Sequence, residues 1–424
     1  MRLDSTLLRH LLVMTILTGL GACDSSSDPG DKAPPAGPPA PTTKPAVAPA
    51  PKPTTTKPAS GSAAVAATAE AAPKAPPVDP CPDKTGAECV DIGLDAENGA
   101  NGVDKDVPRA VALFRAGCER KHLLGCAYLG DMLLDGKGTK PDAAEAMRVY
   151  RLACDGDVAT GCLGIGLLYD RGESVAHDDA QAYNWYVRAC SAGSQRACVY
   201  AGDRQLDGRG IKKDLPGAIK AYTSTCKLNA GLGCLGLGYQ YEIGGGVPKD
   251  PKKAVALYQK SCDLKEAKGC GYWADLLELG KGAPKDVVKA AALDERACTG
   301  GYYPACASAA VMYTRGENGV PKDLPHAIEL SELSCEHKQG RGCHTRGWIY
   351  EKKDAPDGKN LPAAIGFFEK GCELDYFESC WALGDLYHAG SGTAKDDVRA
   401  KLYLAKACTG NKHEKACAML ATLP

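Results

Sequence analysis

The sequence lacks an excess of charge of either sign, because 51 basic residues face 52 acidic residues in a chain of 424. No sequence-wide field therefore favours nucleic acid, and we expect no nucleic-acid partner. No run of 18 or more apolar residues follows the N-terminus, which excludes a membrane-spanning helix there. The C-x2-C spacing and Cys/His clusters are also absent, so we expect no metal site, no haem and no other cofactor.

Cysteine is abundant instead, with 21 residues. A reduced chain of this size rarely carries so many cysteines without the spacing of metal ligands. The count therefore predicts an oxidising compartment outside the cytoplasm.

The N-terminus has the layout of a signal peptide over residues 1–22. Arg2 and Arg9 form a basic start, and residues 11–20 form a short apolar core. The run Leu20-Gly21-Ala22-Cys23 resembles the lipobox of bacterial lipoproteins. This resemblance implies cleavage before Cys23, lipidation of its thiol and anchoring to a membrane of the bacterial envelope, facing the periplasm or the surface. The alternative is a plain secreted chain in which Cys23 is incidental.

Residues 23–80 follow as the lipidated cysteine and a linker. Proline and alanine make up more than half of residues 24–80, and aromatic residues are absent there. Such a segment buries too little apolar surface to fold, and its prolines favour an extended conformation. We expect a disordered spacer that holds the rest of the chain away from the membrane.

Residues 81–424 repeat with a period of 36 or 37 residues. In each unit two cysteines stand eight residues apart, or nine in the last unit, and Cys23 is the one left over. An Asp or Asn stands twelve residues before each first cysteine from Cys118 onward, as a helix N-cap would. Alanine follows four residues after each of these nine caps, and glycines such as Gly136 and Gly244 predict helix ends. The pattern predicts two helices per unit, which we call A and B in chain order.

This period, the alanine at the helix crossing and the Gly-rich exits resemble Sel1-like repeats, which are related to the tetratricopeptide repeat. The C-x7-C spacing narrows the resemblance to the cysteine-rich secreted proteins first known from Helicobacter. It implies an all-α, right-handed superhelical solenoid of about nine helix pairs plus a terminal half-repeat, with a concave face. It also implies a disulfide joining helix A to helix B within each repeat. The implied pairs are Cys81–Cys89, Cys118–Cys126, Cys154–Cys162, Cys190–Cys198, Cys226–Cys234, Cys262–Cys270, Cys298–Cys306, Cys335–Cys343, Cys372–Cys380 and Cys408–Cys417.

Some cysteine-rich proteins of this kind bind or weakly hydrolyse β-lactams, which raises an enzymatic alternative. The S-x-x-K arrangement of Ser224 and Lys227 and the Lys84-Thr85-Gly86 run match two elements of serine β-lactamases. Ser224 falls at the C-terminal end of a predicted helix, where the dipole opposes a nucleophilic oxyanion, and no S-D-N element exists. A chance match is the competing interpretation, and we expect no enzyme activity.

The position five residues after each second cysteine varies between acidic and apolar residues. Variable positions on the concave face of a helical solenoid are where a protein or peptide would bind. The candidate partner-binding residues are Asp131, Asp203, Tyr239, Asp275, Trp348, Trp381 and Asp385. Packing between repeats is the alternative role. The sequence thus predicts a non-catalytic, protein- or peptide-binding scaffold lipoprotein, and an assembly factor for envelope complexes is a further alternative.

Overall fold

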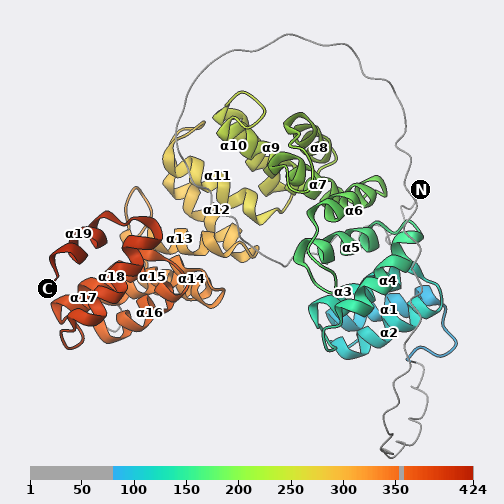
Figure 1. Cartoon of the computed structure of the whole chain (residues 1–424), viewed down its shortest axis with the longest axis horizontal. Coiled ribbons are helices and arrows are strands. Elements are labelled where there is room, and N and C mark those ends of the chain that lie inside the picture. The colour runs from blue at the N-terminus through green and yellow to red at the C-terminus, as the bar shows by residue number, and fades with distance from the viewer. Residues whose placement is uncertain (1–79, 353–357, 424) are drawn as a thin grey trace, which may run out of the picture. The chain divides into compact units, whose positions relative to one another are not determined.

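The computed structural model describes residues 80–352 and 358–423. The chain divides into two units, 1–78 and 79–424, and only the second has described residues (Figure 1). The predicted signal peptide, Cys23 and the linker up to residue 79 lie outside the described residues. Within the described ranges the chain forms nineteen α-helices and no strand, which confirms the predicted all-α solenoid of nine helix pairs and a terminal half-repeat.

The helices alternate between two kinds. The odd-numbered helices each contain the second cysteine of a pair. They are α1 (Gly86–Asn98), α3 (Leu123–Asp135), α5 (Ala159–Arg171), α7 (Gln195–Asp207), α9 (Gly231–Ile243), α11 (Ala267–Leu279), α13 (Tyr303–Arg315), α15 (Gly340–Glu351), α17 (Phe377–Ala389) and α19 (Glu414–Thr422). The even-numbered helices are α2 (Val107–Glu119), α4 (Ala143–Asp155), α6 (Asp179–Ser191), α8 (Leu215–Lys227), α10 (Pro251–Asp263), α12 (Val287–Thr299), α14 (Leu324–Glu336), α16 (Leu361–Glu373) and α18 (Asp397–Asn411).

Every even-numbered helix begins at the predicted acidic or amide cap. In α4, for example, the backbone N–H of Glu145 donates to the Asp142 carboxylate at 2.9 Å, and in α10 Lys253 N–H donates to Asp250 at 3.1 Å. The odd-numbered helices rarely have such a side-chain cap. Most of them instead end at a left-handed glycine, as at Gly136 with φ of 66°. Sequence and structure therefore agree on where the helices start and stop.

The predicted crossing alanines lie at the centre of the packing. All nine are completely buried: Ala110, Ala146, Ala182, Ala218, Ala254, Ala290, Ala327, Ala364 and Ala400. A small side chain at these positions lets the neighbouring helix approach closely. Consecutive helices pack against each other along the array, and most odd-numbered helices also contact the next odd-numbered helix. The odd-numbered helices thus line one common side of the solenoid.

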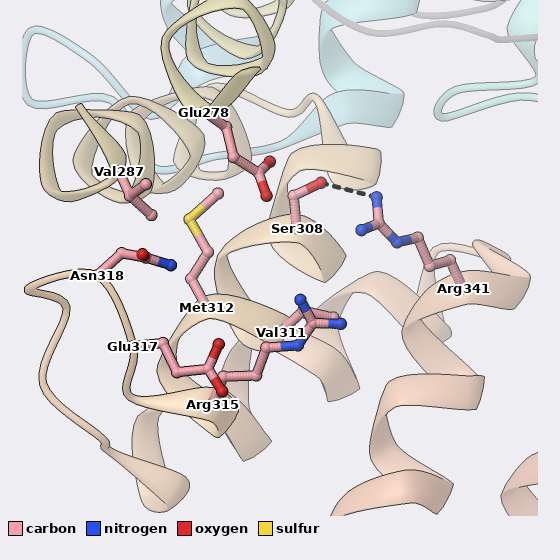
Figure 2. Close-up of a pocket in the computed structure, with 9 residues that line it drawn as sticks. All are labelled: Glu278, Val287, Ser308, Val311, Met312, Arg315, Glu317, Asn318 and Arg341. Carbon is pink, nitrogen blue, oxygen red and sulfur yellow. Dashed lines mark hydrogen bonds between the residues drawn. The ribbon is translucent and has the colours of Figure 1, made fainter. Parts of the chain in front are cut away.

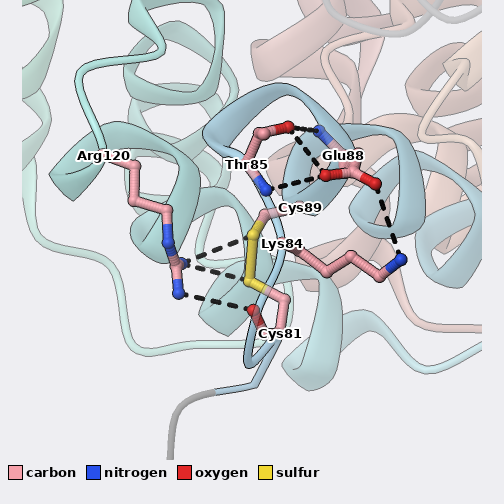
Figure 3. The surroundings of a disulfide bond; sticks show 6 residues. All are labelled: Cys81, Lys84, Thr85, Glu88, Cys89 and Arg120. Carbon is pink, nitrogen blue, oxygen red and sulfur yellow. Dashed lines mark hydrogen bonds and ion pairs between the residues drawn. A yellow bond between two sulfur atoms is a disulfide. The ribbon is translucent and has the colours of Figure 1, made fainter.

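The ten predicted cysteine pairs all form disulfides, with Cα–Cα separations between 4.5 and 5.9 Å. From Cys118 onward, each bond links the end of an even-numbered helix to the start of the next odd-numbered helix. Cys81 instead lies in the irregular segment before α1 (Figure 3). Arg120, just after α2, places its guanidinium 3.2 and 3.4 Å from the two sulfurs of this first bond. The first unit therefore has no even-numbered helix among the described residues before α1, and we interpret it as an end cap.

No helix in the described part of the chain is long and apolar enough to cross a membrane.

Candidate interaction surface

A buried aromatic ring stands four residues before the first cysteine in most even-numbered helices. These rings are Phe114, Tyr150, Tyr186, Tyr222, Tyr258 and Phe368. Each ring lies over a glycine of the preceding odd-numbered helix, four residues after its cysteine. A β-carbon at Gly130 would lie only 2.5 Å from the Tyr150 ring, and one at Gly238 only 2.8 Å from Tyr258. Glycine and ring thus form a matched pair at each of these helix contacts.

The hydroxyl groups of the tyrosines find acidic acceptors on the preceding odd-numbered helix. Tyr150 donates to Asp131 at 2.7 Å, and Tyr222 donates to Asp203 at 2.6 Å. Burial raises the pKa of Asp131 to about 7, although the Tyr150 hydrogen bond opposes this rise. Asp131 and Asp203 were candidate partner-binding residues. In the structure they hold core tyrosines, which is the packing role that the sequence left open.

The same hydrogen bond explains why the position five after the second cysteine alternates. Where that position is apolar, as at Leu167 and Tyr239, the acid stands three residues later. Tyr186 then donates to Asp170 at 3.0 Å, and Tyr258 donates to Glu242 at 2.7 Å. Each core tyrosine therefore has one acidic acceptor, and only its position along the odd-numbered helix changes.

The contact between α11 and α12 breaks this rule. Asp294 occupies the ring position, and Ala274 replaces the matching glycine. The acceptor position still holds an acid, Asp275, so two carboxyl groups share a site that elsewhere holds a hydroxyl donor and a carboxylate. Asp294 is only 2% exposed, and within the described residues its Oδ2 atom has no hydrogen-bond partner.

The electrostatics of this contact are correspondingly unusual. The pKa of Asp294 is raised to about 9, mainly by burial and then by the charges of Asp275 and Glu278, while Arg341 opposes this rise. The pKa of Asp275 is raised to about 6, mainly by desolvation and then by Glu278. Asp275 is nevertheless exposed at its outer edge. We call Asp275, Glu278 and Asp294 the acidic recess.

A cavity of about 90 Å³ lies nearby, and Glu278 is the member of the acidic recess that lines it (Figure 2). Glu278 of α11 lines one side, and Ser308 of α13 and Arg341 of α15 line another. Arg341 donates to the Ser308 hydroxyl at 2.9 Å. At the next contact, between α13 and α14, Ser331 replaces the ring and Ala310 replaces the glycine. Two successive ring positions, Asp294 and Ser331, are therefore occupied by small polar residues instead of rings.

Aromatic side chains flank the recess. Tyr272 on α11 lies 6.4 Å, between ring centroids, from both Tyr239 of α9 and Tyr302 before α13. All three are half-buried. Sequence analysis found Tyr239 and Asp275 but missed Asp294, Glu278, Tyr272 and Tyr302. The signal that could have found Asp294 is the loss of the aromatic residue four before Cys298.

The remaining candidates lie further along the array. Trp348 of α15 is half-buried beneath the Lys352 ammonium, 4.2 Å from the ring centroid. Trp381 of α17 stacks on His413 with the ring centroids 5.4 Å apart. Asp385 is exposed on the same helix. We call one side of the odd-numbered helices the odd-helix face. It is the side that carries the residue five after each second cysteine, and Trp348, Trp381, Asp385, Tyr239 and Asp275 lie on it.

The residues that resemble β-lactamase elements have other surroundings. Thr85 is the N-cap of α1 and forms a capping box with Glu88, while Lys84 pairs with Glu88 at 3.5 Å (Figure 3). Ser224 and Lys227 are both exposed near the end of α8. In the described part of the chain no hydrogen bond joins their side chains. No group of acidic, histidine or cysteine residues in the described ranges has the geometry of a metal site.

Comparison with known families identifies the type of repeat. The Sel1 repeat profile matches residues 92–122, 123–158, 159–194, 195–228, 231–266, 267–302, 304–338 and 377–412. These segments cover well over half of the chain. The chain belongs to the Sel1 repeat family.

In the frame of the Sel1 repeat, the structural unit is an odd-numbered helix followed by an even-numbered helix, as α3 and α4 in 123–158. Each internal disulfide therefore joins two successive repeats. This corrects the predicted placement within a repeat, although the predicted pairs themselves are right. The error arose because the N-cap aspartate was taken as the start of the unit. The family match does not cover α15 and α16.

A solved structure shows the same fold. The crystal structure of c5321, a protective antigen present in uropathogenic Escherichia coli strains and displaying an SLR fold, is 24% identical, with a TM-score of 0.52, over 79% of this chain and 71% of that chain. A Sel1 repeat protein from Oxalobacter formigenes is 22% identical over 80% of this chain and 95% of its own, with a TM-score of 0.49. Cysteine rich protein B of Helicobacter pylori is 33% identical over 32% of this chain and 97% of its own, with a TM-score of 0.26. No curated protein matches the chain.

The disulfides also bear on location. Ten disulfides in one chain form and persist in an oxidising compartment outside the cytoplasm.

Proposed function

We propose that this Sel1 repeat protein is a non-catalytic scaffold that binds a protein or peptide along its odd-helix face, outside the cytoplasm. The observation that carries the proposal is the contrast between two sets of positions. Cap and crossing positions repeat in all nine even-numbered helices, whereas side chains of the odd-helix face change in size and charge from repeat to repeat. Changing surface chemistry on a constant scaffold is how helical solenoids present extended binding sites.

The face offers the side chains that contribute most to protein interfaces. Tyr239, Trp348 and Trp381 are half-buried aromatic residues, and Arg341 and Asp385 are exposed charged residues on the same layer of helices. Aromatic and arginine side chains are enriched among interface residues that dominate affinity. An extended polypeptide crossing several repeats would contact them in succession.

We further propose that Cys23 carries a lipid anchor and that residues 24–80 act as a spacer. The lipobox-like run before Cys23 and the proline-rich composition support this. The anchor would hold the scaffold at a membrane of the bacterial envelope. Palmitate labelling of wild type and Cys23→Ala tests this part separately, because loss of label in the variant is expected only for a lipoprotein.

Site-specific photo-crosslinking tests the binding face. Benzoylphenylalanine is placed at Tyr239 or Trp348, and a matched control places it at Leu402, which is 67% exposed on the even-numbered helix α18. After irradiation of intact cells we expect a discrete adduct from both odd-helix positions and none from the control. Equal labelling from all three positions, or none from the odd-helix face, would contradict the proposal.

A further inference from the structure

From α3 to α13, the last residue of each odd-numbered helix is charged except in two successive helices. This residue stands nine after the second cysteine of the pair. In α9 and α11 it is Ile243 and Leu279, whose exposed fractions are 51% and 60%. In the other four helices it is Asp135, Arg171, Asp207 or Arg315. Two large apolar side chains therefore face solvent where the neighbouring helices present charge.

A cavity of about 290 Å³ lies beside these residues, and we call it the notch. Its lining comes from the ends of α9 and α11 and from the segment that leads into α10, namely Glu242, Ile243, Lys249, Pro251, Leu276 and Lys281. Leu276 is only 1% exposed, whereas Ile243, Lys249 and Lys281 are exposed, so the notch is open to solvent. Cavities of about 150 Å³ can hold a benzene ring, so the notch has room for a leucine side chain.

The segments around the notch are strongly basic. Residues 244–253 and residues 280–289 each carry three lysines and one acid. The equivalent segment 172–181 carries three acids and neither lysine nor arginine, so this charge is not common to all repeats. Among the described residues, Lys249 and Lys281 form no ion pair. The acid that lines the notch, Glu242, already accepts a hydrogen bond from the Tyr258 hydroxyl at 2.7 Å. The notch thus combines an apolar wall with two unpaired ammonium groups.

The notch continues the odd-helix face toward the ends of the helices. Ile243 lies four residues after Tyr239 on α9, and Leu279 lies four residues after Asp275 on α11. Residues four apart share one face of a helix, so a polypeptide on the odd-helix face would also pass over these two apolar side chains. Because α9 and α11 contact each other directly, both helices can act on one segment of a partner.

We propose that the notch binds a protein partner through a leucine side chain flanked by acidic residues. This inference rests on the proposed function and names the chemistry of one subsite of the odd-helix face. The leucine enters the notch against Ile243 and Leu276, and the hydrophobic effect favours this burial. Carboxylates on either side of the leucine pair with Lys249 and Lys281, which selects an acidic segment over a basic one.

The probe is a fluorescent seven-residue peptide with a central leucine between glutamates and with both ends blocked. Comparison peptides replace the leucine with alanine, or the glutamates with lysines. Anisotropy is measured with the oxidised full-length protein at low ionic strength, where ion pairs are screened least. We expect the leucine–glutamate peptide to bind about tenfold more tightly than either comparison peptide.

Ile243→Asp is the main variant, because it places at the end of α9 the residue that α3 and α7 carry there. The variant should fold as wild type does and bind the leucine–glutamate peptide about tenfold more weakly. Lys249→Glu combined with Lys281→Glu should remove the preference for glutamate and keep the preference for leucine. The matched control Arg171→Asp installs the same residue at the end of α5 and should leave binding unchanged.

Several outcomes would overturn this inference. Equal binding of the leucine and alanine peptides by wild type, or undiminished binding by Ile243→Asp, would do so. Vesicles of phosphatidylglycerol and phosphatidylcholine test a membrane as the competing occupant. Vesicle binding that is lost in Ile243→Asp, without any preference among the peptides, would assign the notch to a lipid surface instead. Photo-crosslinking from Trp348 should also weaken in Ile243→Asp, and an unchanged adduct yield would reject the notch while the scaffold function stands.

Discussion

The four tyrosines that stand four residues before a first cysteine show how one side chain serves two purposes. Its ring fills the space above a glycine, and its hydroxyl satisfies an acid that would otherwise be buried without a partner. Tyr150 and Asp131 illustrate the arrangement, with Tyr150 completely buried and the hydrogen bond at 2.7 Å. Polar groups buried in this way contribute to stability only while both partners are present.

Replacing Tyr150 with Phe should therefore cost more than the loss of one hydroxyl suggests. The ring still fits over Gly130, but Asp131 loses its donor, and we expect the free energy of unfolding to fall by about 1–2 kcal/mol. Urea unfolding followed by circular dichroism measures this. Phe114 gives the reverse comparison: the position five after Cys89 is the apolar Leu94, and the acid Glu97 stands three residues later, so we expect Phe114→Tyr not to lower the free energy of unfolding.

The raised pKa of Asp294 makes a prediction about pH. The folded chain retains this proton up to about pH 9, whereas the unfolded chain releases it near the ordinary value of 3.8. Stability contributed by the protonated form is thus complete below pH 4 and is lost as the pH rises toward 9, by up to about 1.4 kcal/mol per pH unit. Urea unfolding of wild type at pH 5 and pH 8 should show this decline more steeply than Asp294→Asn. Parallel slopes in the two proteins would rule out the assignment.

Ser224 allows the enzymatic alternative to be tested with a single substitution. We expect no β-lactam turnover above background, because Ser224 and Lys227 are exposed near the end of α8 without a hydrogen bond between their side chains. Hydrolysis of a chromogenic cephalosporin by wild type and Ser224→Ala measures it. Turnover that disappears in the variant would support the enzymatic alternative and oppose the scaffold.

The two kinds of helix differ in how they are capped. The even-numbered helices begin at an Asp or Asn N-cap, and most odd-numbered helices end at a left-handed glycine. Successive even-numbered helices are also tied together. Lys260 of α10 donates to the backbone carbonyl of Cys226 at 2.9 Å, and Arg296 of α12 donates to that of Cys262 at 2.8 Å. These cations add a second donor to carbonyl groups at helix ends, which also accept from the N–H groups of Asn229 and Lys265 in the following turns. The helix ends are thus stabilised by residues one repeat away.

The cap of α10 can be tested by paired substitutions. Asp250→Ala should lower stability by about 1 kcal/mol, because the N–H of Lys253 loses its acceptor, whereas Asp250→Asn keeps an acceptor and should be nearly neutral. The backbone hydrogen bond from Lys253 lowers the pKa of Asp250. Its contribution should therefore persist at neutral pH and disappear as the pH falls through that lowered pKa. Thermal unfolding at pH 7 compares the two variants.

Most of the helix framework was predictable because its determinants recur. Nine caps, nine alanines and ten cysteine pairs stand at fixed distances, so each unit confirms the others. The acidic recess was not predictable in the same way, because it is a departure from the repeat at Asp294. The alternation that includes Asp131 and Tyr239 was visible in the sequence. Its cause was not, because it depends on which tyrosine hydroxyl reaches which helix across a contact.

For the whole molecule, the disulfides replace the central core that a solenoid lacks. Repeats contact mainly their neighbours, so stability depends on each interface between them. A bond that closes a loop of about nine residues restrains the unfolded chain by about 2.5 kcal/mol, on the chain-entropy account. Because these bonds cross the boundaries between Sel1 repeats, they strengthen the weakest places in such an array.

Removing one internal bond should therefore expose a local boundary. In Cys226→Ala/Cys234→Ala we expect a loss of about 2.5 kcal/mol. Faster hydrogen exchange should be concentrated in α8 and α9. The terminal pair Cys408→Ala/Cys417→Ala serves as the comparison, and its effect should stay within α18 and α19. Uniform acceleration along the chain in both variants would argue against repeat-by-repeat stability. Mass spectrometry of the exported protein should show two hydrogens missing for every disulfide.

Disulfides across repeat boundaries also change how the chain carries tension. If the two ends of the array are pulled apart, the residues between the two cysteines of a pair bear no load, because the bond bypasses them. A repeat that gives way can then lengthen by the roughly 28 residues between bonds, or roughly 95 Å of extended chain, instead of the roughly 125 Å of an unbridged 36-residue unit. Under tension the array would therefore extend one repeat at a time, and the disulfides would limit the length that each unfolded repeat adds.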